Sequence, residues 1–141
     1  MIRLVSEVLY LNWFHLLLSV LPAYLFHLVR ETKKDKLIFK ELLGQINDFK
    51  GELVFIPVNN PNFHWSLLVY ETKSKVFYHY DTLKGANYEY VEPLVRELLE
   101  QIHGKKVELE KYLIAKNDIQ QENGYDCGIA VIAITKRIRE L

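Results

Sequence analysis

The sequence of 141 residues has only one cysteine, Cys127, so no disulfide can form within the chain. A single free thiol fits a reducing compartment, and we therefore expect a cytoplasmic and/or nuclear protein. Eighteen basic residues balance eighteen acidic ones, so no overall field attracts nucleic acid or an anionic membrane. The sequence also lacks the paired cysteine or histidine spacing of a zinc site and a glycine-rich phosphate loop. We expect no cofactor, no metal and no nucleic-acid partner.

The length and composition indicate one domain with a substantial core. A chain of 141 residues is too short for two typical domains. Hydrophobic residues make up 50% of it and aromatic residues 13%, which argues against disorder. There is no internal repeat, low-complexity tract or linker. We therefore predict a single α+β domain over residues 1–141.

The N-terminal stretch Leu4–Val29 is apolar enough to be a borderline candidate for a membrane span. Pro22 would break or kink a spanning helix, and His15 and His27 interrupt the apolar run. Arg3 is the only early basic residue and no small-residue cleavage site follows, unlike in a signal peptide. We favour helices that face the core. A membrane segment and a disordered stretch are the alternatives.

Hydrophobic periodicity predicts the remaining elements. They are a helix over Lys36–Asn47 capped by Asp35, strands over Leu53–Val58, Trp65–Tyr70 and Val76–Tyr80, a helix over Tyr88–Ile102, a strand over Val107–Ala115, and a helix over Ile129–Ile138. His103-Gly104 is a good C-terminal signal for the second of these helices, with His103 as a cation at its end. The last helix is apolar nearly all round from Ile129 to Ile134, so we expect it to be central and buried.

Cys127 lies in the string Asp126-Cys127-Gly128, directly before the last predicted helix. The sulfur would therefore lie in the first helical turn. Unpaired N–H groups and the positive end of the helix dipole lower the pKa of a thiol there. A free cysteine is also often a small buried hydrophobe. From its position alone, Cys127 could equally be a nucleophile or a structural residue.

A cysteine hydrolase needs a histidine to take the thiol proton and a carboxylate or amide to fix the histidine tautomer. The candidates are His15, His27, His64, His79 and His103. His64 stands at the entry to the predicted strand Trp65–Tyr70, whereas His79 lies inside the next strand. If these strands pair through the turn at 72–74, His64 and Asp81 face each other at one sheet edge. We therefore favour His64 with Asp81 as the couple and assign His79 to strand packing.

Four motifs occur in one order along the chain: His64-Trp65, Asp81, Gln121 and Asp126-Cys127-Gly128. In order and spacing this set resembles the ubiquitin-like-modifier proteases, the cysteine peptidases that process and remove SUMO and the neddylation modifier. The strings around the motifs are most similar to the deneddylase branch, the sentrin-specific protease 8-like enzymes. The resemblance covers Leu53 to Ile138. It implies a papain-like cysteine protease fold, in which a central helix with the nucleophile packs against a mixed sheet with the histidine and the aspartate.

The resemblance also implies a role for each of five residues. The nucleophile would be Cys127, the general base and acid His64, the orienting carboxylate Asp81, the side-chain donor of the oxyanion hole Gln121, and the cover over the substrate's Gly-Gly tail Trp65. Gln120 is the neighbouring alternative, and only the offset of six residues from Cys127 selects Gln121. Without the resemblance, a tryptophan that opens a strand would be assigned to the core.

The implied function is that of a thiol protease that cleaves after the C-terminal Gly-Gly of a ubiquitin-like modifier. The neddylation modifier would be the preferred partner and SUMO the second, for deconjugation or precursor processing. One alternative is a same-clan acetyltransferase, although nothing in the sequence marks an acetyl-CoA site. The other is a truncated, non-catalytic relative that only binds the modifier. We expect a shortened N-terminal part, because fewer residues than in the family separate the first core strand from Tyr10-Leu11-Asn12-Trp13, the nearest match to the family's first helix.

Overall fold

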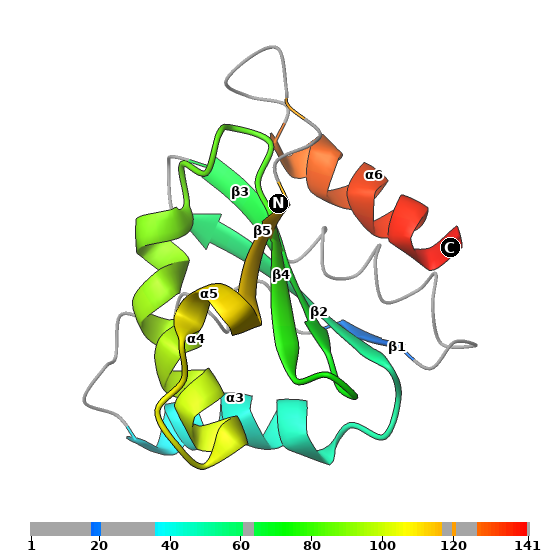
Figure 1. Cartoon of the computed structure of the whole chain (residues 1–141). Helices are drawn as coiled ribbons and strands as arrows, with labels where there is room; N and C mark the ends of the chain where they lie inside the picture. Colours follow the sequence, from blue (N-terminus) through cyan, green and yellow to red (C-terminus); the bar gives the residue numbers. More distant parts are fainter. Residues whose placement is uncertain (1–17, 21–35, 61–63, 117–119, 121–126, 141) are drawn as a thin grey trace.

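The computed structural model of the protein describes residues 18–20, 36–60, 64–116, 120 and 127–140 (Figure 1). In chain order the elements are β1 (Leu18–Val20), α3 (Lys36–Asp48), β2 (Leu53–Asn60), β3 (His64–Glu71), β4 (Val76–Tyr80), α4 (Tyr88–His103), α5 (Leu109–Tyr112), β5 (Leu113–Lys116) and α6 (Cys127–Glu140).

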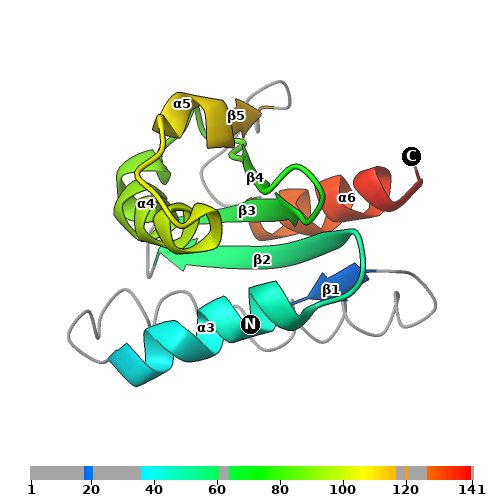
Figure 2. The same ribbon diagram turned by 60° about the horizontal axis from the view of Figure 1, so that its bottom comes forward.

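The strands form one mixed sheet in the order β1-β2-β3-β4-β5, which Figure 2 shows from β1 in blue to β5 in yellow-orange. The two inner pairings, β2 with β3 and β3 with β4, are antiparallel, and the two outer pairings are parallel. The β3–β4 hairpin closes through the turn at 72–74. There Lys75 adopts φ 57° and its N–H donates to the Glu71 carbonyl oxygen at 2.9 Å.

Side chains alternate between the two faces of the sheet, as they must in extended strands. One face packs against α3 and α4 and forms the larger core, which includes Leu42, Ile46, Val54, Ile56, Leu68, Phe77, Val91, Val95 and Leu98. The other face packs against α6 and forms a smaller cluster of Phe55, Trp65, Leu67, Val69 and Ile134. Figure 1 shows α4 and α6 on opposite sides of the sheet. The result is a helix–sheet–helix sandwich.

Helix α4 follows the loop 81–87, which links it to the end of β4. The helix ends at Gly104, whose φ of 70° is the left-handed conformation that glycine adopts at little cost. Near this end, His103 Nε2 lies 3.0 Å from the Lys75 carbonyl oxygen, and the His103 ring contacts Tyr112. The start of α4 is therefore fixed at the end of β4, and its last turn contacts the β3–β4 hairpin.

Most predicted elements are confirmed, with ends that differ by at most two residues. The segment Val107–Ala115 was predicted as one strand, and this is wrong. Leu109–Tyr112 is a helical turn, and only Leu113–Lys116 is a strand. Leu109 and Leu113 are both buried and stand four residues apart, a spacing that suits one turn of helix.

Two further expectations need correction. Leu18–Val20 forms a strand parallel to β2, although we favoured helix throughout Leu4–Val29. Helix α6 was expected to be central and buried, from its nearly continuous apolar run over Ile129–Ile134. Ile134 and Thr135 are buried, but Ala133 is exposed, so this helix has a solvent-facing side.

The remainder of Leu4–Val29, with His15, His27 and the match at 10–13, lies outside the described residues, as does the cap Asp35. In the part of the chain that the structure describes, no helix is long and apolar enough to span a membrane.

Candidate active site

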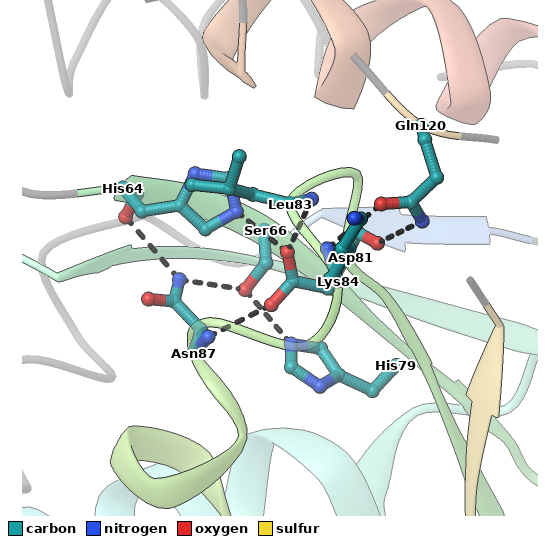
Figure 3. A network of polar contacts seen from close by, with 8 residues as sticks. All are labelled: His64, Ser66, His79, Asp81, Leu83, Lys84, Asn87 and Gln120. Carbon is teal, nitrogen blue, oxygen red and sulfur yellow. Dashed lines mark hydrogen bonds and ion pairs between the residues drawn. The ribbon is translucent and has the colours of Figure 1, made fainter. Parts of the chain in front are cut away.

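His64 is the first residue of β3, and Asp81 directly follows β4. His64 Nε2 lies 2.6 Å from Asp81 Oδ1, and both side chains are fully buried (Figure 3). The hairpin register explains this contact, because β3 and β4 pair from Glu71 opposite Val76 to Leu67 opposite Tyr80. The start of one strand and the end of the next therefore meet at the same edge. The predicted contact between His64 and Asp81 is confirmed.

The Asp81 carboxylate also accepts two backbone hydrogen bonds. The Leu83 N–H donates to Oδ1 at 3.0 Å and the Asn87 N–H donates to Oδ2 at 2.8 Å. Burial raises the pKa of Asp81, but the hydrogen bonds from His64 and from the two N–H groups lower it, and the net pKa lies below its usual value. Asp81 is therefore an anion in a fixed orientation.

This anion determines which nitrogen of His64 is available for proton transfer. A carboxylate can only accept, so Nε2 of His64 bears the proton that is donated to Asp81. The other nitrogen, Nδ1, then has the lone pair that can take a proton from a thiol. Such a carboxylate-oriented imidazole is the arrangement that a general base requires.

The second buried histidine, His79, is in a different environment. It lies on β4 opposite Leu68, and its Nε2 is 2.9 Å from the hydroxyl oxygen of Ser66 on β3. Burial lowers the pKa of His79 to about 4, although the nearby Asp81 charge opposes the shift. His79 is therefore neutral at physiological pH, and its burial agrees with the predicted packing role.

Asn87 belongs to the same network, and the sequence reasoning missed it. Its Nδ2 donates to the His64 carbonyl oxygen at 3.2 Å and to Ser66 Oγ at 2.9 Å. The available signals were its place in the polar loop before α4 and its distance of six positions from Asp81. Neither signal reveals contacts with residues that are more than twenty positions away in the sequence.

Gln120 connects the segment that precedes α6 to the loop 81–87. Its Oε1 accepts the Lys84 N–H at 2.8 Å, and its Nε2 donates to the Asp81 carbonyl oxygen at 3.2 Å. Cys127 is the first residue of α6, as predicted, and α6 packs on the sheet face of β3 that bears Trp65. The side chain of Cys127 and the whole of Gln121 lie outside the described residues.

Trp65 is 8% exposed and belongs to the cluster between the sheet and α6. Trp65 lies between His64 and Ser66 on β3. Because side chains alternate along a strand, the Trp65 side chain points to the opposite face of the sheet from those of His64 and Ser66. Among the described residues, no group of three or more histidine, cysteine, aspartate or glutamate side chains could hold a metal ion.

Several known proteins are similar to this chain in sequence. It is 29% identical over 136 residues to the probable sentrin-specific protease 8 of Dictyostelium discoideum, covering 89% of this chain and 55% of that protein. It is 30% identical to the NEDD8-specific protease 1 of Arabidopsis thaliana, covering 75% and 49%, and 37% identical to the human sentrin-specific protease 8, covering 61% and 42%. The chain thus spans about half the length of these relatives.

Solved structures agree on the fold. The C-terminal Ulp1 protease domain in complex with Smt3, the yeast ortholog of SUMO, superposes with a TM-score of 0.68 at 19% identity, covering 99% of this chain and 63% of that one. The Xanthomonas campestris effector protein XopD bound to ubiquitin gives a TM-score of 0.72 at 22% identity, covering 99% and 74%. The expected α+β, papain-like cysteine protease fold is confirmed. Residues 26–140 match the family model, and the chain belongs to the Ulp1 protease family, C-terminal catalytic domain.

Proposed function

We propose that this chain is a thiol protease that cleaves after the C-terminal Gly-Gly of a ubiquitin-like modifier. The observation that supports this most directly is the buried hydrogen bond between His64 Nε2 and Asp81 Oδ1. It stands at the edge of a sheet whose β3 packs against α6, the helix that begins at Cys127. A base, its orienting carboxylate and a thiol at a helix start are the three parts that a cysteine nucleophile needs.

In the proposed reaction, His64 Nδ1 takes the proton of the Cys127 thiol, and the thiolate attacks the carbonyl carbon of the last glycine. The Asp81 carboxylate stabilises the imidazolium that forms, since it accepts the Nε2–H throughout. His64 then returns the proton to the leaving amine, and water hydrolyses the acyl-enzyme. Gln121 would donate to the tetrahedral oxyanion, a contribution of roughly 3 kcal/mol.

The assignment of the oxyanion donor to Gln121 rather than Gln120 is supported by the bonds that Gln120 already makes. Its amide spans the Lys84 N–H and the Asp81 carbonyl oxygen and so anchors the loop. Trp65 would cover the Gly-Gly tail and order the scissile carbonyl near Cys127.

For the modifier, we propose the neddylation modifier first and SUMO second. The relatives named as sentrin-specific protease 8 and as NEDD8-specific protease 1 support this order. The substrate would be a precursor or a conjugate of that modifier. The segments Asn59–Phe63 and Lys84–Tyr90 would contribute to the choice of modifier.

The test is covalent capture. Probes with a C-terminal electrophile are built on the neddylation modifier, SUMO and ubiquitin, and their rates of reaction with the chain are compared. We expect capture by the neddylation probe to be fastest, and Cys127→Ala to abolish it while reversible modifier binding remains.

Each other outcome would contradict a defined part of the proposal. Faster capture by the SUMO probe would contradict the order of modifiers but leave the mechanism intact. If no probe reacted although thiol titration showed Cys127 to be accessible, the chain would be a non-catalytic modifier-binding relative.

A further inference from the structure

Asn87 immediately precedes α4, yet its side chain does not cap the helix. Asparagine at this position normally accepts a hydrogen bond from an N–H of the first turn through its side-chain oxygen. Here the side chain makes no capping hydrogen bond, and the Tyr90 and Val91 N–H groups both donate to the Asn87 backbone carbonyl oxygen. Asn87 is completely buried, and its Oδ1 has no hydrogen-bond partner within the described part of the chain. Asn87 therefore lacks the usual capping hydrogen bond, and within the described residues its buried side-chain oxygen is not hydrogen-bonded.

The side chain instead points to the His64–Asp81 pair, as Figure 3 shows. The backbone N–H of Asn87 donates to Asp81 Oδ2 at 2.8 Å, on the oxygen that His64 does not contact. Its Nδ2 donates to the carbonyl oxygen of His64 at 3.2 Å. One residue therefore holds the carboxylate on one side and the backbone of the histidine on the other.

Ser66 and His79 fix the orientation of the Asn87 amide. Because an amide NH₂ group only donates, Ser66 Oγ accepts from Nδ2 at 2.9 Å. His79 is neutral, so its Nε2 can accept the hydroxyl proton of Ser66 across 2.9 Å. If the amide were rotated by half a turn, Oδ1 would face the His64 carbonyl oxygen, and two acceptors would be in contact. The direction of each hydrogen bond follows from these constraints.

We propose that Asn87 is a positioning residue that keeps the His64 imidazole aligned with Asp81, so that Nε2 bears the proton and Nδ1 stays available to the nucleophile. This inference rests on the proposed protease function for its kinetic consequence. The alignment itself is a property of the folded chain. Asn87 touches no reacting atom and acts only through His64 and Asp81.

The experiment compares the wild type with Asn87→Ala, Asn87→Leu and Val95→Ala. The Asn87 variants keep the backbone N–H to Asp81 but lose the Nδ2 donor, and leucine fills about the same volume if the alanine variant does not fold. Val95 is buried in the core side of α4, away from the pair, so its alanine variant controls for a general loss of stability. All variants are measured well below their unfolding temperatures.

The first measurement is the ring ¹⁵N spectrum of His64 near neutral pH, which reports the tautomer without any turnover. We expect the Nε2–H form in the wild type and in Val95→Ala, and averaged shifts from a mixture of tautomers in the Asn87 variants. The second is cleavage of a modifier fused to a C-terminal reporter. There we expect kcat to fall by about tenfold to 100-fold in the Asn87 variants, with KM changed by less than about twofold.

The two measurements separate the two proposals. If the wild type did not cleave any modifier fusion, the proposed function would fail, and the ring spectra would still decide whether Asn87 orients His64. Unchanged His64 signals in both Asn87 variants would overturn the positioning role, as would a loss of kcat no greater than in Val95→Ala.

Discussion

Replacing His79 with glutamine should remove a defined part of the pH dependence of stability. His79 is buried on β4, and burial lowers its pKa from 6.5 to about 4; the Asp81 charge opposes this shift to a smaller extent, and His64 adds to it. Glutamine has a similar reach and can still bond the Ser66 hydroxyl, but it does not bind a proton. The comparison therefore isolates the titration of one imidazole.

The sign follows from proton binding. Between about pH 6.5 and pH 4 the unfolded chain binds a proton at His79 and the folded chain does not, so stability falls as the pH falls. With a pKa of about 6.5 unfolded and about 4 folded, the free energy of unfolding should drop by about 2 kcal/mol between about pH 7 and pH 5. The complete shift corresponds to about 3 kcal/mol at still lower pH. Below this window the protonation of Asp81 also lowers the free energy of unfolding as the pH falls, because the folded-state pKa of Asp81 is lowered as well.

Urea unfolding at a series of pH values, followed by tryptophan fluorescence, measures this difference. We expect the curve of His79→Gln to be flatter than that of the wild type by about 2 kcal/mol over this interval. Ser66→Ala is the matched control. It removes the hydroxyl but leaves His79 buried, so it should keep the slope of the wild type. An identical pH dependence in His79→Gln and the wild type would refute the argument that His79 is held neutral by burial.

Three further predictions concern the proposed chemistry. His64→Ala should lose nearly all cleavage of a modifier–reporter fusion, whereas Asp81→Asn should lose less because an amide can still hold the ring; wild-type turnover in Asp81→Asn would contradict the orienting role. Gln121→Ala should lower kcat by roughly 10²–10³-fold. Gln120→Ala should lower kcat less than Gln121→Ala and should loosen the loop 81–87, measured by amide hydrogen exchange; an equal loss of kcat would mean that the wrong glutamine was chosen. Trp65→Ala should cost about 3 kcal/mol of stability, because the ring is part of the cluster under α6, and should slow capture of a Gly-Gly electrophile, whereas Trp65→Phe should slow capture without the loss of stability.

The predictability of the fold from sequence depended on how local each signal was. The strands Leu53–Asn60, His64–Glu71 and Val76–Tyr80 follow from short apolar runs between turn residues, and their hairpin pairing brought His64 to Asp81. Leu109–Tyr112 was mistaken for strand because Leu109 and Leu113 fit both an alternating and a helical spacing. For such short segments the sheet and the neighbouring helices decide the conformation, and periodicity does not.

The residues of the candidate site also differ in how far local sequence signals could identify them. His64, Asp81 and Cys127 could be found because each stands beside a recognisable element and within a motif. Asn87 could not be found, because its contacts with His64 and Ser66 depend on how the loop 81–87 folds back over the start of β3. Local rules assign an asparagine before a helix to capping, and this one departs from that rule.

The network also explains how two buried histidines at one end of a sheet differ in their chemistry. Among the described residues, the Asp81 carboxylate contacts His64 directly, while His79 has the neutral hydroxyl of Ser66 as its partner. A buried imidazole can become charged during a reaction only if an anion stabilises it. His64 has that anion and His79 does not, and Asn87 bonds to both Ser66 and the backbone of His64. The proposed assignment of the base to His64 is therefore supported by the distribution of charge as well as by the motif.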